Sequence, residues 1–319
     1  MNMDKIFTVA VVGPTASGKT ELAINISRAL DGEIISADSM QIYRGMDIAT
    51  AMPTSYEQSQ AKHHFINFLD VNESFSVAQY KHMADSVAHD IASRGKIPVI
   101  CGGTGLYINT LLENIELFEQ ASDMKVREKL VKEAHDYGIE KLFERLRKID
   151  SDSANRLHIN DEKRIIRALE VYESTGMTIS EQLTRSRLNP SAYDVCYIGI
   201  TAERQYLYDR IDRRVDLMLE NGLIEEAKRF YSRHDYVTAA QAIGYKELKP
   251  YLDGECTLKE ASDRLKMQTR RYAKRQLTWF RKNENINWLY SDKLTKEEML
   301  SEALRIIADR KGRVCTDEQ

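Results

Sequence analysis

Residues 13–20 read Gly-Pro-Thr-Ala-Ser-Gly-Lys-Thr, and this octapeptide decides how the first part of the chain folds. It fits the pattern G-x-x-x-x-G-K-[ST], follows a β-branched run at 7–12 and precedes a helix-like stretch at 18–30. Backbone amides at the start of such a helix form a nest for anionic oxygens. Lys19 adds a positive charge there, and the Thr20 hydroxyl can hold Mg²⁺. The pattern predicts a loop that binds a diphosphate or triphosphate; an ordinary strand–turn–helix connection is the alternative.

The sequence around this loop alternates short apolar strands with helices. We expect strands at 7–12, 33–37 and 97–101, and a long helix at 76–94. Continuous apolar strands separated by helices predict an α/β fold with a doubly wound parallel sheet that is covered on both faces.

From residue 116 the pattern changes to charged amphipathic helices, expected at 123–136, 139–149, 161–173 and 178–184. A strand expected at 195–200 is the element needed to extend the sheet. We therefore predict a P-loop α/β core domain of residues 1–115 and 190–319, interrupted by an all-helical insertion domain of residues 116–189. The C-terminal part is expected to be mostly helical, with a strand at 286–290.

The composition excludes several classes of protein. Of 319 residues, 42% are hydrophobic and 30% charged, with 15 Gly and 5 Pro, which argues against collagen-like or disordered chains. Lys and Arg number 46 against 49 Asp and Glu, so a polyanionic partner must bind a local basic surface. No apolar run approaches the ~20 residues of a membrane span, and the start lacks the apolar core of a signal peptide. We expect a soluble cytoplasmic protein. The four scattered cysteines indicate reduced thiols and no structural metal site.

Two groups next to the expected strand ends are candidates for chemistry. Asp38 follows the second strand, at the sheet edge where ligands bind, and an isolated carboxylate there can act as a general base. An Asp that caps the following turn is the alternative. The third strand ends in Gly-Gly-Thr-Gly at 102–105, where the backbone can approach a ligand and Thr104 offers a hydroxyl; a plain helix entry is the alternative.

Basic residues form three further groups. Arg210 and Arg214 lie at i, i+4 of a helix expected at 202–221, so they either clamp a phosphate or pair with surface carboxylates. The segment 264–283 has eight Lys or Arg and no Asp or Glu, with aromatic residues interleaved. A helical stripe toward the core is formed by Leu265, Thr269, Tyr272, Gln276 and Phe280, which leaves the charges outside. This suits a nucleic-acid phosphate backbone as well as it suits a solvated helix. A smaller basic cluster lies at 163–167.

Taken together, these motifs resemble the bacterial tRNA dimethylallyltransferases, also called tRNA isopentenyltransferases. The resemblance runs from about residue 9 to 288 and is carried by the runs 13–20, 38–47, 102–107, 161–170, 242–246 and 273–281. It implies transfer of a dimethylallyl group from dimethylallyl diphosphate to the N6 amine of the adenine 3′ of the anticodon in tRNA, with release of diphosphate. The adenine must then be flipped out of the anticodon loop.

The resemblance also implies which residues form the site. It assigns catalytic roles to Asp38, Lys19, Thr15 and Arg214, and it assigns the binding of Mg²⁺ to Thr20. The donor diphosphate is assigned to Gly13, Pro14, Thr15, Ala16, Ser17, Gly18, Lys19, Thr20, Arg210 and Arg214. Contacts with the tRNA anticodon stem–loop are assigned to Asp38, Ser39, Met40, Gln41, Thr104, Arg127, Lys163, Arg164, Ile165, Ile166, Arg167, Gln241, Ala242, Ile243, Gly244, Tyr245, Lys246, Arg271, Lys274 and Arg275. If the basic segment 264–283 meets tRNA phosphates, Arg270 is expected to be a further contact.

Three other functions compete with this one. A small-molecule kinase would share the loop and the strand-end carboxylate, but it does not account for the helical insertion. A non-catalytic RNA-binding protein could use the loop as a nucleotide switch. An isopentenyltransferase acting on free adenine nucleotide would differ only in lacking an RNA surface. We expect the tRNA enzyme to act as a monomer, without contact with a membrane.

Overall fold

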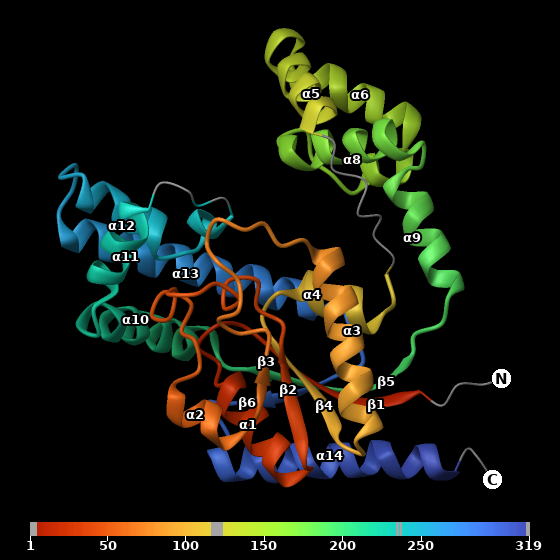
Figure 1. Cartoon of the computed structure of the whole chain (residues 1–319), viewed down its shortest axis with the longest axis vertical. Helices are drawn as coiled ribbons and strands as arrows, with labels where there is room; N and C mark the ends of the chain where they lie inside the picture. Colours follow the sequence, from red (N-terminus) through yellow and green to blue (C-terminus); the bar gives the residue numbers. More distant parts are fainter. Residues whose placement is uncertain (1–4, 116–123, 234–235, 237, 317–319) are drawn as a thin grey trace. The chain divides into compact units, whose positions relative to one another are not determined.

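The computed structural model describes residues 5–115, 124–233, 236 and 238–316. Its strands are β1 (Ile6–Val12), β2 (Gly32–Ser36), β3 (His63–His64), β4 (Ile97–Gly102), β5 (Tyr193–Thr201) and β6 (Ile286–Tyr290). They form one parallel sheet in the order β3-β2-β4-β1-β5-β6 (Figure 1). The chain adds strands on one side of β1 and then, with β5 and β6, on the other. The predicted α/β fold with a doubly wound parallel sheet is confirmed.

The helices follow the predicted pattern, with bounds that differ by a few residues. Those before and after the predicted insertion are α1 (Lys19–Ala29), α2 (Ser55–Gln60), α3 (Val77–Ser93), α4 (Gly105–Leu112), α10 (Arg204–Glu220), α11 (Leu223–Ser232), α12 (Tyr245–Leu252), α13 (Leu258–Phe280) and α14 (Lys296–Thr316). The intervening ones are α5 (Met124–Tyr137), α6 (Ile139–Ile149), α7 (Ser151–Asn155), α8 (Glu162–Thr175) and α9 (Ile179–Leu188). The short elements α2, α7 and β3 have too few residues to show a period, and the sequence did not predict them.

The sheet core is built from apolar side chains on both faces of the central strands. Residues 9–12 of β1 have no exposed surface, which is the burial expected of a strand covered on two sides. On one face, Val9 and Val11 pack with Ile26 of α1 and Ile307 of α14 in a single cluster. Because the strands are parallel, their carboxyl ends meet at one edge, and this edge carries the candidate site.

The chain separates into two compact units. The first comprises residues 1–75, 83–108 and 192–319, and the second comprises residues 76–82 and 109–191. The second unit contains α5–α9 and has its own core, which includes Leu130, Leu146, Ile165 and Leu169. The predicted insertion starts within 116–123, outside the described residues. Among the described helices, none combines the length and apolar character that would let it cross a membrane.

A buried carboxylate ties β2 to its neighbours. Glu33 is 4% exposed, and its two oxygens accept hydrogen bonds from the guanidinium of Arg94 and the ring of His64. Lys62 Nζ lies 3.2 Å from the same carboxylate. The hydrogen bonds from Arg94 hold the pKa of Glu33 far below its ordinary value of 4.5. Its contribution to stability is therefore present above about pH 4.5 and declines as the pH falls below that value.

We expect Glu33→Gln to lower the free energy of unfolding by about 1–3 kcal/mol at pH 7, because charge-assisted hydrogen bonds are lost. The difference in unfolding free energy between wild type and variant should shrink by about 1.4 kcal/mol per pH unit below pH 4.5. Below that pH the unfolded wild-type chain binds a proton at Glu33, so the stabilisation by the ionised carboxylate declines. Urea unfolding at pH 7 and pH 3.5 measures both values. Asp90→Asn is the matched control: it removes another, 61% exposed, carboxylate partner of Arg94 and should cost under about 1 kcal/mol. A constant deficit at both pH values would contradict the assignment.

Candidate active site

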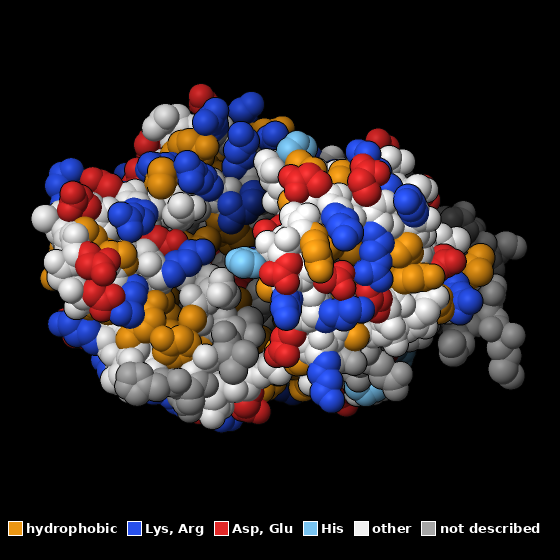
Figure 2. All heavy atoms as spheres, turned by 90° about the horizontal axis from the view of Figure 1, so that it is seen from above, with side chains coloured by type: hydrophobic (Ala, Val, Ile, Leu, Met, Phe, Trp, Pro, Cys, Tyr) orange, Lys and Arg blue, Asp and Glu red, His pale blue; other side chains and the backbone are white. Residues whose placement is uncertain are grey.

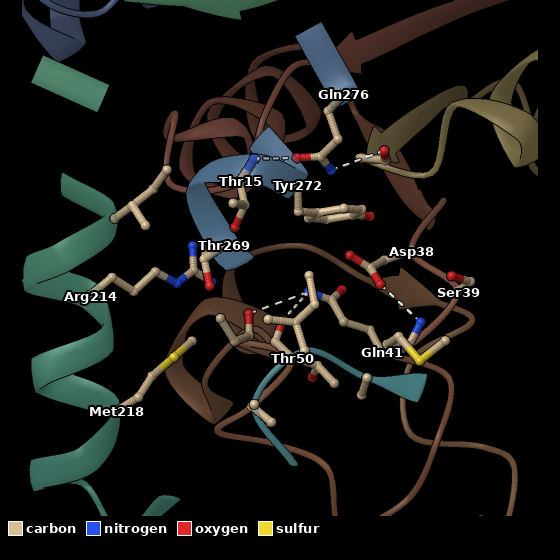
Figure 3. A pocket seen from close by; sticks show the side chains of 18 of the residues that line it. Thr15, Asp38, Ser39, Gln41, Thr50, Arg214, Met218, Thr269, Tyr272 and Gln276 are labelled. Carbon is tan, nitrogen blue, oxygen red and sulfur yellow. Dashed lines mark hydrogen bonds between the residues drawn. The ribbon is translucent and has the colours of Figure 1, made fainter. Parts of the chain in front are cut away.

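A cavity of about 280 Å³ lies at the carboxyl edge of the sheet. Its wall combines the phosphate-binding loop, the segment after β2, the end of β4 and parts of α10 and α13 (Figure 3). The lining is completed by the segment 49–51, by residues 241–244 and 246, and by Leu223 of α11. All of these belong to the first compact unit. The sequence separation of the segments is large, so only the fold brings them together.

The phosphate-binding loop has the backbone that its glycines allow. Gly13 and Gly18 have φ of 147° and 101°, and a Cβ on Gly13 would lie 2.4 Å from the carbonyl oxygen of Ile200. Ala16 also adopts a left-handed φ of 62°. Ser17 Oγ is buried and has no hydrogen-bond partner among the described residues. A buried, unsatisfied hydroxyl in a loop of this shape suits a ligand oxygen.

Lys19 opens α1 and lies against this loop. Its Nζ donates a hydrogen bond to the carbonyl oxygen of Pro14 at 2.6 Å. Its pKa is lowered to about 8, mainly by burial and to a smaller extent by Arg214, whereas Cys101 and Asp38 oppose the shift. Removal from water is the largest cause, because it disfavours the charged amine. An anion bound beside Lys19 would restore the charged form.

Gln276 of α13 joins the two glycine-rich turns. Its Oε1 accepts a hydrogen bond from the amide of Thr15 at 2.8 Å, and its Nε2 donates to the carbonyl of Gly103 at 3.0 Å. A Cβ on Gly103 would lie 2.1 Å from this nitrogen, so glycine is needed there. The sequence placed Gln276, Thr269 and Tyr272 on a core-facing stripe without recognising them as pocket residues. The polar side chains in this otherwise core-facing stripe were the sequence signal that could have indicated a pocket.

Asp38 faces the cavity from the segment after β2, opposite Arg214 in Figure 3. Its Oδ1 accepts a hydrogen bond from the amide of Met40 at 2.9 Å. One oxygen therefore holds the turn, as the capping alternative proposed, and the second oxygen is left for the cavity. The two interpretations of Asp38 are compatible.

Thr104 lies beside Asp38 and holds the neighbouring backbone. Its Oγ1 accepts a hydrogen bond from the amide of Ser39 at 3.1 Å, and its own amide donates to Ala37 at 3.1 Å. The hydroxyl of Tyr272 is hydrogen bonded to Thr104, and burial raises the pKa of Tyr272 above its ordinary value. Tyr272 is thus a neutral wall of the cavity, between the loop and Asp38 (Figure 3).

The two arginines of α10 lie on one face of that helix but occupy different places. Arg214 lines the cavity and reaches into it from α10 (Figure 3). Burial lowers its pKa, while Asp38 opposes this shift. Arg210 lies outside the lining: its Nη1 donates to the hydroxyl of Tyr206, and its Nη2 would lie 3.9 Å from a Cβ on Gly18. Arg214 therefore lies at the cavity and Arg210 near Gly18 of the loop, and a joint clamp on a phosphate stays a prediction.

The residues present fit a magnesium ion shared with a diphosphate. Thr20 lines the cavity beside Lys19, so its hydroxyl is available to the ion. Within the described ranges, no group of three or more His, Cys, Asp or Glu side chains could hold a metal by itself. Mg²⁺ commonly takes one or two protein ligands and completes its shell with phosphate and water.

The basic residues of α13 divide into paired and exposed groups. Arg270 donates to both carboxylate oxygens of Asp212, and Lys266 lies 2.5 Å from Asp216, so these two cations tie α13 to α10. Arg270 is therefore paired with a carboxylate in this structure, and its contact with a phosphate stays a prediction. The exposed basic residues are Arg264, Arg271, Lys274, Arg275, Arg281 and Lys282. Figure 2 shows Lys and Arg interspersed with Asp and Glu over much of one face. A polyanion would therefore have to bind where several basic side chains lie close together.

The predicted tRNA contacts at 241–246 are not equivalent. All except Tyr245 line the cavity. Tyr245 has no exposed surface and its hydroxyl donates to Glu226 at 3.0 Å, so its side chain cannot contact RNA. The polar or charged members that remain are Gln241 and Lys246, which are exposed.

The predicted contacts at 127 and 163–167 all lie in the second unit. Ile165 and Ile166 are buried in its core, so contact with RNA from this run depends on Lys163, Arg164 and Arg167. Arg167 Nη1 lies 3.1 Å from the fully buried carboxylate of Glu170, and Arg127 lies 4.0 Å from it. The side chains of Arg127 and Arg167 are 45% and 41% exposed. Both side chains are therefore partly accessible to solvent.

Comparison with known proteins gives the family. A family model described as IPP transferase matches residues 41–283. The tRNA dimethylallyltransferase of Acetivibrio thermocellus is 48% identical over 305 residues, which cover 95% of this chain and 97% of that protein. The one from Halalkalibacterium halodurans is 46% identical over 304 residues, covering 95% and 96%.

Solved structures agree with these relatives. The full-length tRNA isopentenylpyrophosphate transferase from Bacillus halodurans has a TM-score of 0.75 at 42% identity, covering 99% of this chain and 100% of that one. A eukaryotic dimethylallyltransferase acting on tRNA has a TM-score of 0.77 at 30% identity, covering 89% of this chain and 74% of that one. The chain therefore belongs to the tRNA dimethylallyltransferase family.

Proposed function

We propose that this enzyme transfers a dimethylallyl group to tRNA in the cavity at the carboxyl edge of its sheet. The donor is dimethylallyl diphosphate and the acceptor is N6 of the adenine on the 3′ side of the anticodon. The observation that carries this proposal is that the phosphate-binding loop, Arg214 and Asp38 all face one cavity. A leaving diphosphate and a proton acceptor can therefore lie on either side of the reacting atoms.

In this reaction, N6 forms a bond to the terminal carbon of the allyl chain as the bond from that carbon to oxygen breaks. The electron pair leaves with diphosphate, and the proton of N6 passes to the free oxygen of Asp38. Lys19 and Arg214 stabilise the charge that develops on the leaving group. Thr20 would hold a Mg²⁺ ion, which adds further positive charge beside the diphosphate. Thr15 lies at the loop and is fixed by Gln276.

Two surfaces are proposed to hold the RNA. Arg271, Lys274 and Arg275 present charge from α13 next to the cavity, and Arg127, Lys163, Arg164 and Arg167 present it from the second unit. The flipped adenine would then meet Ser39, Met40, Gln41 and Thr104. We also place the enzyme in the cytoplasm, where it meets tRNA. We also propose that the enzyme acts as a monomer.

The experiment that tests the function gives the protein labelled dimethylallyl diphosphate with either tRNA or AMP. Label should enter tRNA and should be lost when the adenine next to the anticodon is replaced by a pyrimidine. Label in AMP with none in tRNA would instead make the chain an isopentenyltransferase of free nucleotide. The family match does not favour the kinase or the RNA-binding switch.

The exposed charges of α13 lead to a prediction about salt. Neutralising Arg271 and Lys274 together, both to Gln, should flatten the slope of log K against log salt for tRNA binding by about 1–2 units. The reason is that each phosphate contact releases about 0.7–0.9 of a counterion. The turnover rate at saturating tRNA should stay at the wild-type value, because neither side chain lines the cavity.

The control for this variant removes two positive charges elsewhere. Arg305 and Lys311 are exposed on α14, and the corresponding double Gln variant should keep the wild-type slope. Equal slopes for the α13 variant and the wild type would show that this face of α13 is only solvated. The RNA surface would then have to be sought in the second unit.

A further inference from the structure

A buried carboxylate lies behind the cavity, and the proposed reaction does not use it. Glu226 of α11 is 2% exposed. Its Oε2 accepts a hydrogen bond from the amide of Ile48 at 2.8 Å, and its Oε1 accepts from the amide of Ala49 at 2.9 Å and from the Tyr245 hydroxyl at 3.0 Å. Burying a charged carboxylate is costly unless hydrogen bonds compensate it, and here three donors do so.

The two amides belong to a segment that holds a pocket side chain. Directly after them, the carbonyl oxygens of Thr50 and Ala51 both lie 3.3 Å from Gln41 Nε2, which donates to them. Gln41 Oε1 in turn accepts from the Ser36 hydroxyl at 3.3 Å. These contacts settle which end of the amide faces which way. In Figure 3, Gln41 and Thr50 lie side by side at the cavity.

A chain of contacts thus runs from α11 to the cavity. Glu226 holds the backbone at 48–49, that backbone fixes the two carbonyls at 50–51, and the carbonyls orient the Gln41 amide. Ala51 has a left-handed φ of 48°, a conformation that a non-glycine residue keeps only when its surroundings hold it. A carboxylate can accept from two neighbouring amides at once, whereas a neutral amide in its place has only one oxygen.

We infer that Glu226 is a positioning residue for the acceptor base: it fixes the segment 48–51 and thereby the orientation of Gln41 toward the flipped adenine. This inference rests on the proposed function of the cavity. Glu226 touches neither substrate. Its effect should appear in the recognition of tRNA, while the loop that holds the diphosphate should be unaffected.

The test is Glu226→Gln, which keeps the volume but turns an NH₂ group toward one of the two backbone amides. The repulsion between donors should displace segment 48–51. We expect KM for tRNA to rise about 10-fold, the worth of a hydrogen bond of about 1.4 kcal/mol, with kcat within about 3-fold. The dissociation constant for diphosphate should stay at the wild-type value. If this variant has a lowered Tm, Glu226→Asp, which keeps the charge on a shorter side chain, should change KM in the same direction.

A matched control comes from the adjoining helix. Glu247 of α12 is also buried, at 3% exposed, but it accepts from a single backbone amide, that of Gly244 at 2.8 Å. A glutamine at position 247 can still accept that bond, so Glu247→Gln should leave KM within about 2-fold. A similar rise of KM for tRNA in both variants would contradict the inference, because it would show that replacing either buried carboxylate perturbs the surrounding structure in a general way.

A double-mutant cycle with Gln41→Ala completes the test. If Glu226 acts through Gln41, adding Glu226→Gln to Gln41→Ala should raise KM by less than about 2-fold more, since the group to be positioned is gone. An additive rise would overturn the inference, as would an unchanged KM in folded Glu226→Gln. If Gln41→Ala alone leaves KM unchanged, the proposed role of Gln41 fails. If Gln41→Ala raises KM and Glu226→Gln does not, only the role of Glu226 fails.

Discussion

Replacing Asp38 with Asn is expected to lower the single-turnover rate by about 10²–10⁴-fold, the usual effect of removing a positioned general base. The exocyclic amine of adenine is a weak nucleophile, so loss of its proton as the new bond forms is where a fixed carboxylate helps. Asn retains an oxygen that can accept the amide of Met40, which Asp38 holds at 2.9 Å. The turn should therefore persist while the proton acceptor is lost. The measurement is the rate with preloaded donor at saturating tRNA.

The affinities for tRNA and for diphosphate separate this prediction from a structural defect. Both dissociation constants should stay within about 3-fold of the wild-type values in Asp38→Asn, since the shape of the turn is kept. Asp38→Ala removes the base and the turn contact together, so it should add a loss of tRNA affinity. Wild-type turnover in Asp38→Asn would show that Asp38 is a turn residue and that the proton leaves by another route.

Local patterns were enough to predict the sheet and the phosphate-binding loop. The strand 286–290 was predicted with the bounds that β6 has, and the helix at 139–149 with those of α6. Both are short stretches whose apolar period is complete within the element itself. The loop was recognisable because its glycines and Lys19 lie within eight residues.

The walls of the cavity were less accessible to sequence reasoning, because their contacts join distant parts of the chain. Gln276 bonds to Gly103 across 173 residues, and Glu226 bonds to Ile48 across 178. Neither pairing leaves a periodic signal. Arg270 shows the converse case: its position in an acid-free run suggested a free cation, but Asp212 on another helix neutralises it. Composition along one helix cannot reveal a partner on its neighbour.

The last prediction concerns Lys19, whose amine lies among the groups that face the departing diphosphate. Lys19→Ala should lower turnover by about 10²–10³-fold, as expected when one charge-stabilising donor is removed from a transition state. It should also weaken binding of the donor, because the charge acts on the bound diphosphate as well. Thr104→Ala is the contrasting variant: Thr104 bonds to Ser39 on the acceptor side, so donor affinity should be preserved. Equal loss of donor affinity in both variants would contradict this division.

A pH series tests the charge of Lys19 directly. Because burial lowers its pKa to about 8, Lys19 is positively charged below that pH and loses its proton as the pH rises through it. The affinity for diphosphate should therefore fall between pH 7 and pH 9 in the wild type. Diphosphate itself titrates in this range, so the informative quantity is the ratio of the dissociation constants of Lys19→Ala and wild type at each pH. This ratio should decline as the pH rises, since the wild type approaches the uncharged state that the variant already has. A ratio that stays constant from pH 7 to pH 9 would mean that Lys19 keeps its proton throughout this range. The negative charges of Asp38 and the bound anion would then raise the pKa of Lys19 by more than burial lowers it.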